Sequence, residues 1–148
     1  MSKNSLLFIG LAVAIIATIG SLFLSEVMYF IPCELCWFQR IMMYPLTLIL
    51  GLAYLKRDYK QAYYVCILSI LGGLIALLHY LIQMLPFESK TSCGIVPCTV
   101  DYLNWFGFIT IPFLALIAFL IISITSFTVW KRVREHSCNE LTHSLKKE

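Results

Sequence analysis

The stretch that decides the fold runs from Leu6 to Ser25 and reads LLFIGLAVAIIATIGSLFLS. It carries no charged side chain, and its length matches the roughly 20 apolar residues that a helix needs to cross the hydrocarbon core of a bilayer. A cleaved signal peptide is the alternative, but the apolar segment of a signal peptide is shorter, about 7 to 15 residues. We therefore expect a helix that spans the membrane and stays in the protein.

Further apolar stretches of similar length follow along the chain, which is 60% hydrophobic and only 13% charged. The third span of the chain contains Gly72 and Gly73, which would let a neighbouring helix approach closely. We predict an all-α membrane protein, an antiparallel four-helix transmembrane bundle in one domain over residues 1–130, followed by a charged cytoplasmic tail over 131–148. The predicted spans cover about 6–25, 37–55, 62–85 and 108–129.

The positive charges predict how this bundle lies in the membrane. Lys3, the segment 56–60 and the segment 131–134 all fall on one side of a four-span chain, whereas the opposite loops offer only Lys90 and Arg40. Short cytoplasmic loops retain Lys and Arg, so we expect both termini in the cytoplasm. The net charge of +3 forms no continuous basic face, so nucleic acid is not an expected partner.

The cysteines sort by compartment on this topology. The chain has six, of which four fall in external loops as two pairs. These pairs are Cys33 with Cys36 and Cys93 with Cys98. Disulfides persist outside the cytosol, so the pairs are the informative cysteines. Of the other two, we expect Cys66 to be a small apolar core residue and the last one to be a free cytoplasmic thiol.

Three interpretations of the pairs are open. Disulfides with a purely structural role would constrain the unfolded chain little, because the loops that they close are short. Four thiolates could instead bind a soft metal such as zinc or copper, although we expect no histidine near them and no resident metal. The third interpretation is exchange between dithiol and disulfide, for which two vicinal pairs on one membrane face provide a donor and an acceptor. We favour exchange.

Local chemistry around Cys36 supports this choice. Cys36 lies where the second span begins, so the helix N-terminus presents partial positive charge to its sulfur. Arg40 follows four residues later on the same helical face, and both effects stabilise the thiolate, which is the nucleophile. An arginine within a span is by default a functional hypothesis, although one near the interface can also extend its charge into the headgroup region.

Residues 32–40, PCELCWFQR, resemble the signature of the DsbB family, the quinone-linked membrane oxidases that recharge thioredoxin-like disulfide donors. A second external cysteine pair and Trp105, just ahead of the fourth span, extend the resemblance over all four spans. The spacing from Cys93 to Cys98 is shorter than in the better known members and looks like the short form of the family called BdbC.

The resemblance implies an electron route in the bacterial plasma membrane. A reduced extracytoplasmic DsbA-like thioredoxin-fold protein would attack the second pair at Cys93, and the freed Cys98 would then attack Cys33. Cys36 would emerge as the thiolate that donates to a bound quinone, either menaquinone or ubiquinone, beside Arg40. The implied role is disulfide formation in exported proteins.

His79 falls where family members often carry a histidine close to the quinone, so the resemblance implies a quinone-site residue. Because Leu and Tyr residues surround it in the sequence, a packed or interfacial side chain is the alternative. Two other functions remain open. One is a vitamin K epoxide reductase-like oxidoreductase, although in that family the Cys-x-x-Cys pair lies late in the bundle. The other is a soft-metal-binding membrane protein that uses the four external cysteines.

Overall fold

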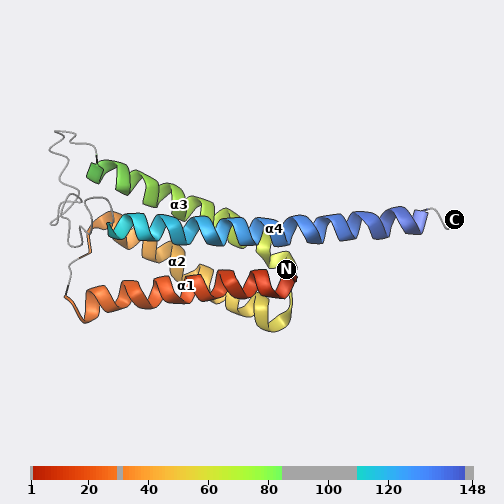
Figure 1. Cartoon of the computed structure of the whole chain (residues 1–148), viewed down its shortest axis with the longest axis horizontal. Coiled ribbons are helices and arrows are strands. Elements are labelled where there is room, and N and C mark those ends of the chain that lie inside the picture. Colours follow the sequence, from red (N-terminus) through yellow and green to blue (C-terminus); the bar gives the residue numbers. More distant parts are fainter. Residues whose placement is uncertain (1, 30–31, 85–109, 146–148) are drawn as a thin grey trace.

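The computed structural model describes residues 2–29, 32–84 and 110–145 of the chain, with side chains placed as far as residue 138. Within these ranges the chain is all-helical, with one short 3-10 turn, η1 (Tyr59–Gln61), between the second and third helices (Figure 1). The long helices are α1 (Lys3–Glu26), α2 (Glu34–Lys56), α3 (Ala62–Met84) and α4 (Ile111–Leu145). All four are long and apolar enough to cross a membrane.

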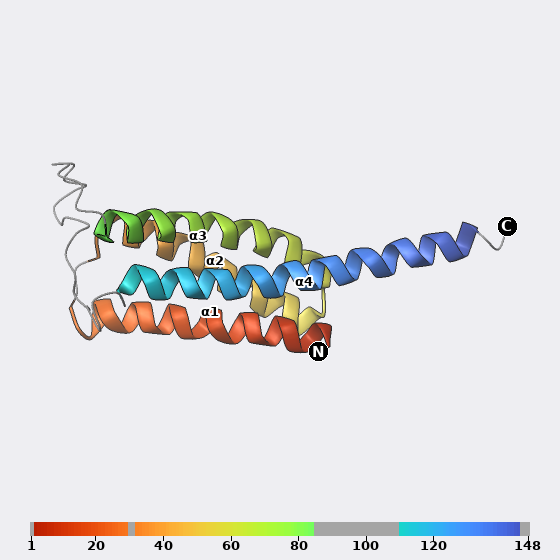
Figure 2. The same ribbon diagram turned by 45° about the horizontal axis from the view of Figure 1, so that its top comes forward.

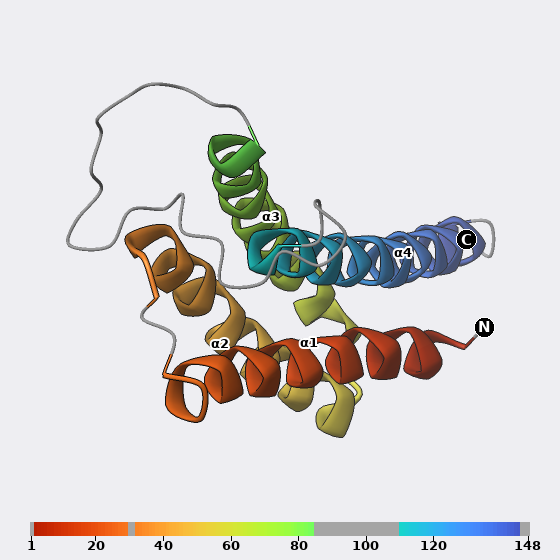
Figure 3. The ribbon, with the colours of Figure 1, turned by 60° about the vertical axis from the view of Figure 1, so that its left-hand side comes forward.

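The helices run alternately up and down as an elongated bundle (Figures 1 and 2). Each of α2 and α4 packs against both α1 and α3. Figure 3, which views the bundle more nearly end-on, shows α1 and α3 separated by these two helices. The expectation of an all-α fold with four membrane-length helices is confirmed. α4 does not end where the predicted fourth span ends, but continues as a helix well beyond the bundle (Figure 2).

Small residues set the distance between helices, as membrane bundles require. A Cβ added at Gly72 of α3 would collide with the ring of Phe119, which is fully buried in α4. A Cβ at Gly73 would sit at an ordinary 3.5 Å from Phe119. The predicted close approach of a helix at these glycines is confirmed, and Gly72 is the position that requires it.

The outer surface of the bundle is apolar. Large aliphatic side chains point outward from several helices, including Ile16 (71% exposed), Leu48 (70%) and Ile124 (65%). In water such a surface would drive aggregation, but in a bilayer it faces acyl chains. The buried core is correspondingly small, and much of the apolar composition serves contact with lipid.

The segments that carry positive charge gather at one end of the bundle. Lys3 lies over the ring of Tyr59 at 5.8 Å, and the Tyr59 hydroxyl donates a hydrogen bond to Asn4. The ring of Trp130, where α4 leaves the bundle, lies 5.7 Å from that of Tyr63. This end is therefore opposite to the end where α2 begins (Figure 1).

Candidate active site

Two cysteines meet at the beginning of α2. Cys33 is the N-cap residue, with extended backbone angles of φ −71° and ψ 170°, and Cys36 lies in the first turn. Their sulfur atoms are 3.2 Å apart. A disulfide bond is about 2.05 Å long, so the pair is a dithiol here and needs only a small side-chain rotation to close. The three-residue spacing produces this geometry, because residues i and i+3 share a helical face.

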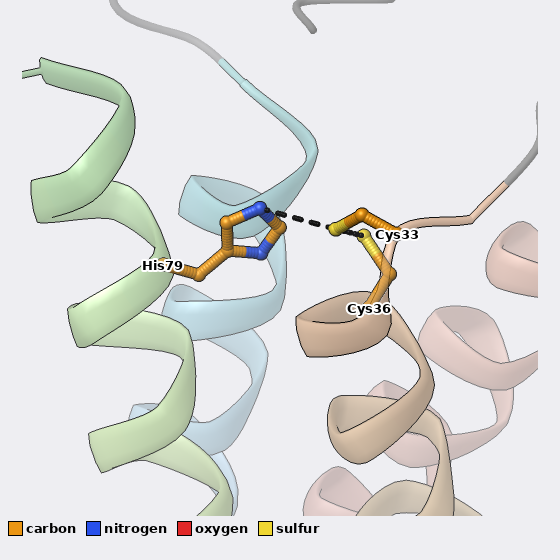
Figure 4. A group of neighbouring side chains, drawn as sticks. All are labelled: Cys33, Cys36 and His79. Carbon is orange, nitrogen blue, oxygen red and sulfur yellow. Dashed lines mark hydrogen bonds between the residues drawn. The ribbon is translucent and has the colours of Figure 1, made fainter. Parts of the chain in front are cut away.

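His79 of α3 lies against this pair (Figure 4). Its Nε2 atom is 3.5 Å from the sulfur of Cys33, and the side chain is only 1% exposed. The expectation that no histidine lies near the external thiols is therefore wrong for Cys33. Sequence reasoning failed here because 46 residues separate the two positions, and only the packing of α2 against α3 brings them together.

Gln39 completes the cluster and was missed by the sequence analysis. It is buried, with 6% of its surface exposed, and its Nε2 atom lies 3.3 Å from Nδ1 of His79. In this orientation the amide N–H donates to Nδ1, so the imidazole proton sits on Nε2 and faces Cys33. If the amide were rotated by 180°, its oxygen would accept a hydrogen bond from Nδ1–H, and Nε2 would carry no proton. The available signal was an amide side chain three positions after Cys36, next to Arg40 in a span that is apolar over most of its length.

The two thiols differ in their surroundings. The Cys33 thiol donates its hydrogen bond to the sulfur of Cys36, and this bond together with burial raises the pKa of Cys33 to about 11, although the contact with His79 acts in the opposite direction. Cys33 therefore keeps its proton at neutral pH. The accepting sulfur is that of Cys36.

Arg40 of α2 is held by hydrogen bonds to α1, whereas His79 contacts the cysteines from α3. Its Nε–H donates to the hydroxyl of Ser21 in α1 at 2.8 Å, and a second guanidinium N–H donates to the backbone carbonyl of Ser21 at 3.0 Å. The guanidinium also lies 5.9 Å from the centre of the Trp37 ring. Three contacts hold the charge one helical turn from Cys36. Ser21 was not singled out from the sequence, because a serine in an apolar span carries no signal of its own.

Some of the other residues singled out from the sequence lie outside the described residues, and the structure places the rest in α3 and α4. Cys93, Cys98 and Trp105 lie outside the described residues, so the second cysteine pair stays a prediction. Cys66 is buried in α3, as expected. Cys138 is exposed on the part of α4 that leaves the bundle.

Residues 3–129 match the family described as "Disulfide bond formation protein DsbB". The chain belongs to the DsbB family. The match favours this family over the vitamin K epoxide reductase-like alternative, which the cysteine pairs alone also allow.

Individual relatives place the chain within the DsbB family. Disulfide bond formation protein C of Bacillus subtilis (strain 168) is 53% identical over 126 residues, which cover 82% of this chain and 91% of that protein. Probable disulfide formation protein C 1 of Bacillus anthracis is 52% identical over 127 residues, covering 84% and 91%. Probable disulfide formation protein of Coxiella burnetii is 43% identical over 124 residues, covering 82% and 84%. No solved structure matches the chain.

The likeness to protein C confirms the expected BdbC-like form. This DsbB-family chain is a membrane oxidoreductase of disulfide bond formation. The family match ends at residue 129, so the projecting part of α4 lies beyond it.

Proposed function

We propose that this chain reoxidises an extracytoplasmic DsbA-like thioredoxin-fold protein and passes the electrons to a membrane quinone. The observation that carries the proposal is the pair Cys33 and Cys36, with sulfurs 3.2 Å apart, at the beginning of a membrane-length helix. Such a pair can alternate between dithiol and disulfide with almost no movement of the backbone. Placed there, it meets both an aqueous thiol partner and a lipid-soluble oxidant.

The electron route uses all four external cysteines. A thiolate of the reduced partner attacks the Cys93–Cys98 disulfide at Cys93 and releases the thiolate of Cys98. Cys98 then attacks the Cys33–Cys36 disulfide at Cys33, which releases Cys36 as a thiolate. The second partner thiol attacks the partner's own sulfur in the mixed disulfide and releases Cys93 as a thiolate, so the partner leaves as a disulfide with two electrons fewer. Cys93 then attacks Cys98 in the mixed disulfide between Cys98 and Cys33, which re-forms the Cys93–Cys98 disulfide and releases Cys33 as a thiolate. Cys33 and Cys36 return to the disulfide when their two electrons leave.

The residues around Cys36 fit a quinone. Trp37, Phe38 and Ile41 are each about half exposed, so α2 presents apolar side chains to a lipid-soluble ring next to the thiols. Arg40 holds a fixed positive charge one turn away, suited to a carbonyl oxygen that gains negative charge. A bound quinone would supply a two-electron, two-proton acceptor. Protein dithiol pairs alone differ by small potentials, and such an acceptor gives the route its direction.

His79 has a place in the same scheme. With the Gln39 amide turned so that its oxygen accepts from Nδ1–H, the Nε2 that contacts Cys33 carries no proton and can take up the one that this thiol must lose before the disulfide re-forms. We keep Arg40 and His79 as the quinone-site residues of the proposal. His79 would act from the Cys33 side of the site, through the proton it shares with that sulfur.

We propose the same membrane orientation that the charges predict, with both termini in the cytoplasm of a bacterial cell and the cysteines outside. The gathering of Lys3, η1 and the start of the α4 projection at one end of the bundle supports this orientation. On that arrangement the cysteine end serves exported proteins, and residues 131–148 form a cytoplasmic tail.

The direct test mixes the purified full chain, a quinone and a reduced thioredoxin-like donor, and follows quinone absorbance. Cys36→Ser should abolish quinone reduction, because the donating thiolate is gone. Cys138→Ser, at an exposed position outside the bundle, is the matched control and should retain turnover. Retained turnover in Cys36→Ser would overturn the assigned role of Cys36.

A second arm tests the order of the exchange. A donor that lacks its resolving cysteine should become trapped as a mixed disulfide on Cys93, and mass spectrometry of the linked peptide would identify the position. Trapping on Cys98 would reverse the order. Stoichiometric zinc or copper bound by the four external cysteines in the purified protein would favour the metal-binding alternative instead.

A further inference from the structure

We propose that the reduced form of this site also binds Zn²⁺, through the sulfurs of Cys33 and Cys36 and the Nε2 of His79. The inference rests on the proposed function only because the two cysteines must pass through a dithiol state. It concerns a different donor set from the four external thiolates, since His79 comes from α3 and the second cysteine pair is not needed.

The distances between the donor atoms suit a tetrahedral ion. One donor atom from each of the three side chains lies within 4.8 Å of the other two, and Figure 4 shows the side chains pointing toward one another. With Zn–S near 2.3 Å and Zn–N near 2.0 to 2.1 Å, tetrahedral angles place sulfur and nitrogen about 3.5 Å apart and two sulfurs about 3.8 Å apart.

The observed sulfur to nitrogen distance, from Cys33 to His79, is 3.5 Å and already fits. The sulfurs of Cys33 and Cys36 are 3.2 Å apart and must open by roughly 0.6 Å, which a small χ1 rotation of Cys36 provides. The Cys36 sulfur lies within 4.8 Å of a His79 ring nitrogen and has to reach about 3.5 Å, so the adjustment falls on the Cys36 side chain. The site is therefore nearly formed before the ion arrives.

Gln39 supplies the support that a histidine ligand usually has. A zinc-bound imidazole nitrogen carries no proton, so the other ring nitrogen carries one and donates it to a neighbouring oxygen. The buried amide of Gln39 lies 3.3 Å from Nδ1 of His79, and after a half-turn its carbonyl oxygen accepts that hydrogen bond. The cluster can thus switch between a thiol-facing and a metal-facing imidazole without repacking.

Charge balance favours a divalent ion. Cys33 and His79 are both buried. Two unpaired thiolates in such surroundings would cost free energy, because burial removes the water that stabilises their charge. Binding of Zn²⁺ releases the two thiol protons and leaves a site with no net charge among the ion and its two thiolates. Soft thiolate donors with one imidazole select Zn²⁺ over hard cations such as Mg²⁺ and Ca²⁺.

Binding of the ion and formation of the disulfide exclude each other, because both use the same two sulfurs. Zn²⁺ would therefore hold the site in its reduced state and stop quinone reduction until the ion is removed. Three protein ligands leave a fourth position for water, as in catalytic zinc sites.

The test uses Co²⁺ as a spectroscopic substitute for Zn²⁺, added without oxygen to the reduced full chain in a membrane mimetic. A Cys93→Ser, Cys98→Ser double variant removes the other external pair. We expect one equivalent of visible absorbance typical of a tetrahedral cobalt thiolate, bleached by one equivalent of Zn²⁺ and absent from the oxidised protein. His79→Ala should weaken binding more than tenfold, and Gln39→Leu by about 10- to 100-fold.

A second measurement in the unaltered chain guards against a misfolded variant. One equivalent of Zn²⁺ should protect Cys33 and Cys36 from alkylation, whereas the exposed Cys138 should react as before. Absence of cobalt absorbance from the reduced protein, equal absorbance from the oxidised protein, or unchanged binding in His79→Ala would each overturn the proposal. Quinone reduction measured with a chelator present is independent of these outcomes, so the two proposals fail separately.

Discussion

Replacing Ser21 with alanine is expected to raise the KM for quinone about fivefold and to leave capture of the thiol partner unchanged. The reason is the position of Arg40, whose guanidinium donates one hydrogen bond to the Ser21 hydroxyl and one to its backbone carbonyl. The substitution removes the first bond and keeps the second. Ser21 therefore acts as a positioning residue for the charge beside the thiols.

The magnitude follows from the bond that is lost. A hydrogen bond from a charged donor contributes about 1.5 to 3 kcal/mol when buried. Arg40 and Ser21 are only partly buried and one bond remains, so we take about 1 kcal/mol, which corresponds to roughly a fivefold change. Arg40→Ala loses both bonds and the charge, and its effect should be larger. Arg40→Lys keeps the charge but not the two-donor geometry and should fall between them.

The assay is steady-state quinone reduction with a saturating reduced donor, alongside trapping of a donor that lacks its resolving cysteine. Ser5→Ala is the matched control, since Ser5 lies on the same helix at the opposite end and its hydroxyl contacts only Ser2 among the hydrogen bonds described. If Ser21→Ala left the KM for quinone unchanged while Arg40→Ala raised it, the anchoring to α1 would have no role. Equal losses in quinone use and trapping would indicate a folding defect.

Two further predictions concern the thiols and the packing. In the reduced protein Cys36 should be alkylated before Cys33 at neutral pH. The raised pKa of Cys33, about 11, keeps this thiol protonated until the pH approaches that value. Equal alkylation rates of the two cysteines, measured by mass spectrometry, would contradict this prediction. Gly72→Ala should lower the stability of the detergent-solubilised protein by about 1 to 3 kcal/mol, since its Cβ would collide with Phe119, whereas Gly73→Ala is the tolerated control in thermal unfolding.

Much of the fold could be predicted from local composition. A helix of about 20 apolar residues is stable in a bilayer whatever its neighbours, because it satisfies its own backbone hydrogen bonds, so the apolar stretches alone indicated the membrane helices. The spacing of Cys33 and Cys36 determined their proximity in the same way, since residues three apart share a helical face. The placement of Arg40 one turn later also came from the sequence.

Contacts between helices were decided only by the tertiary structure. His79 meets Cys33, Gln39 meets His79, and Ser21 meets Arg40 because of how each helix is rotated about its own axis and how closely its neighbour packs. In a membrane bundle the face that packs against other helices and the face that contacts lipid are both apolar. Composition therefore does not determine how each helix is rotated about its axis. The sequence determined which residues could carry the chemistry, and packing decided which of them touch.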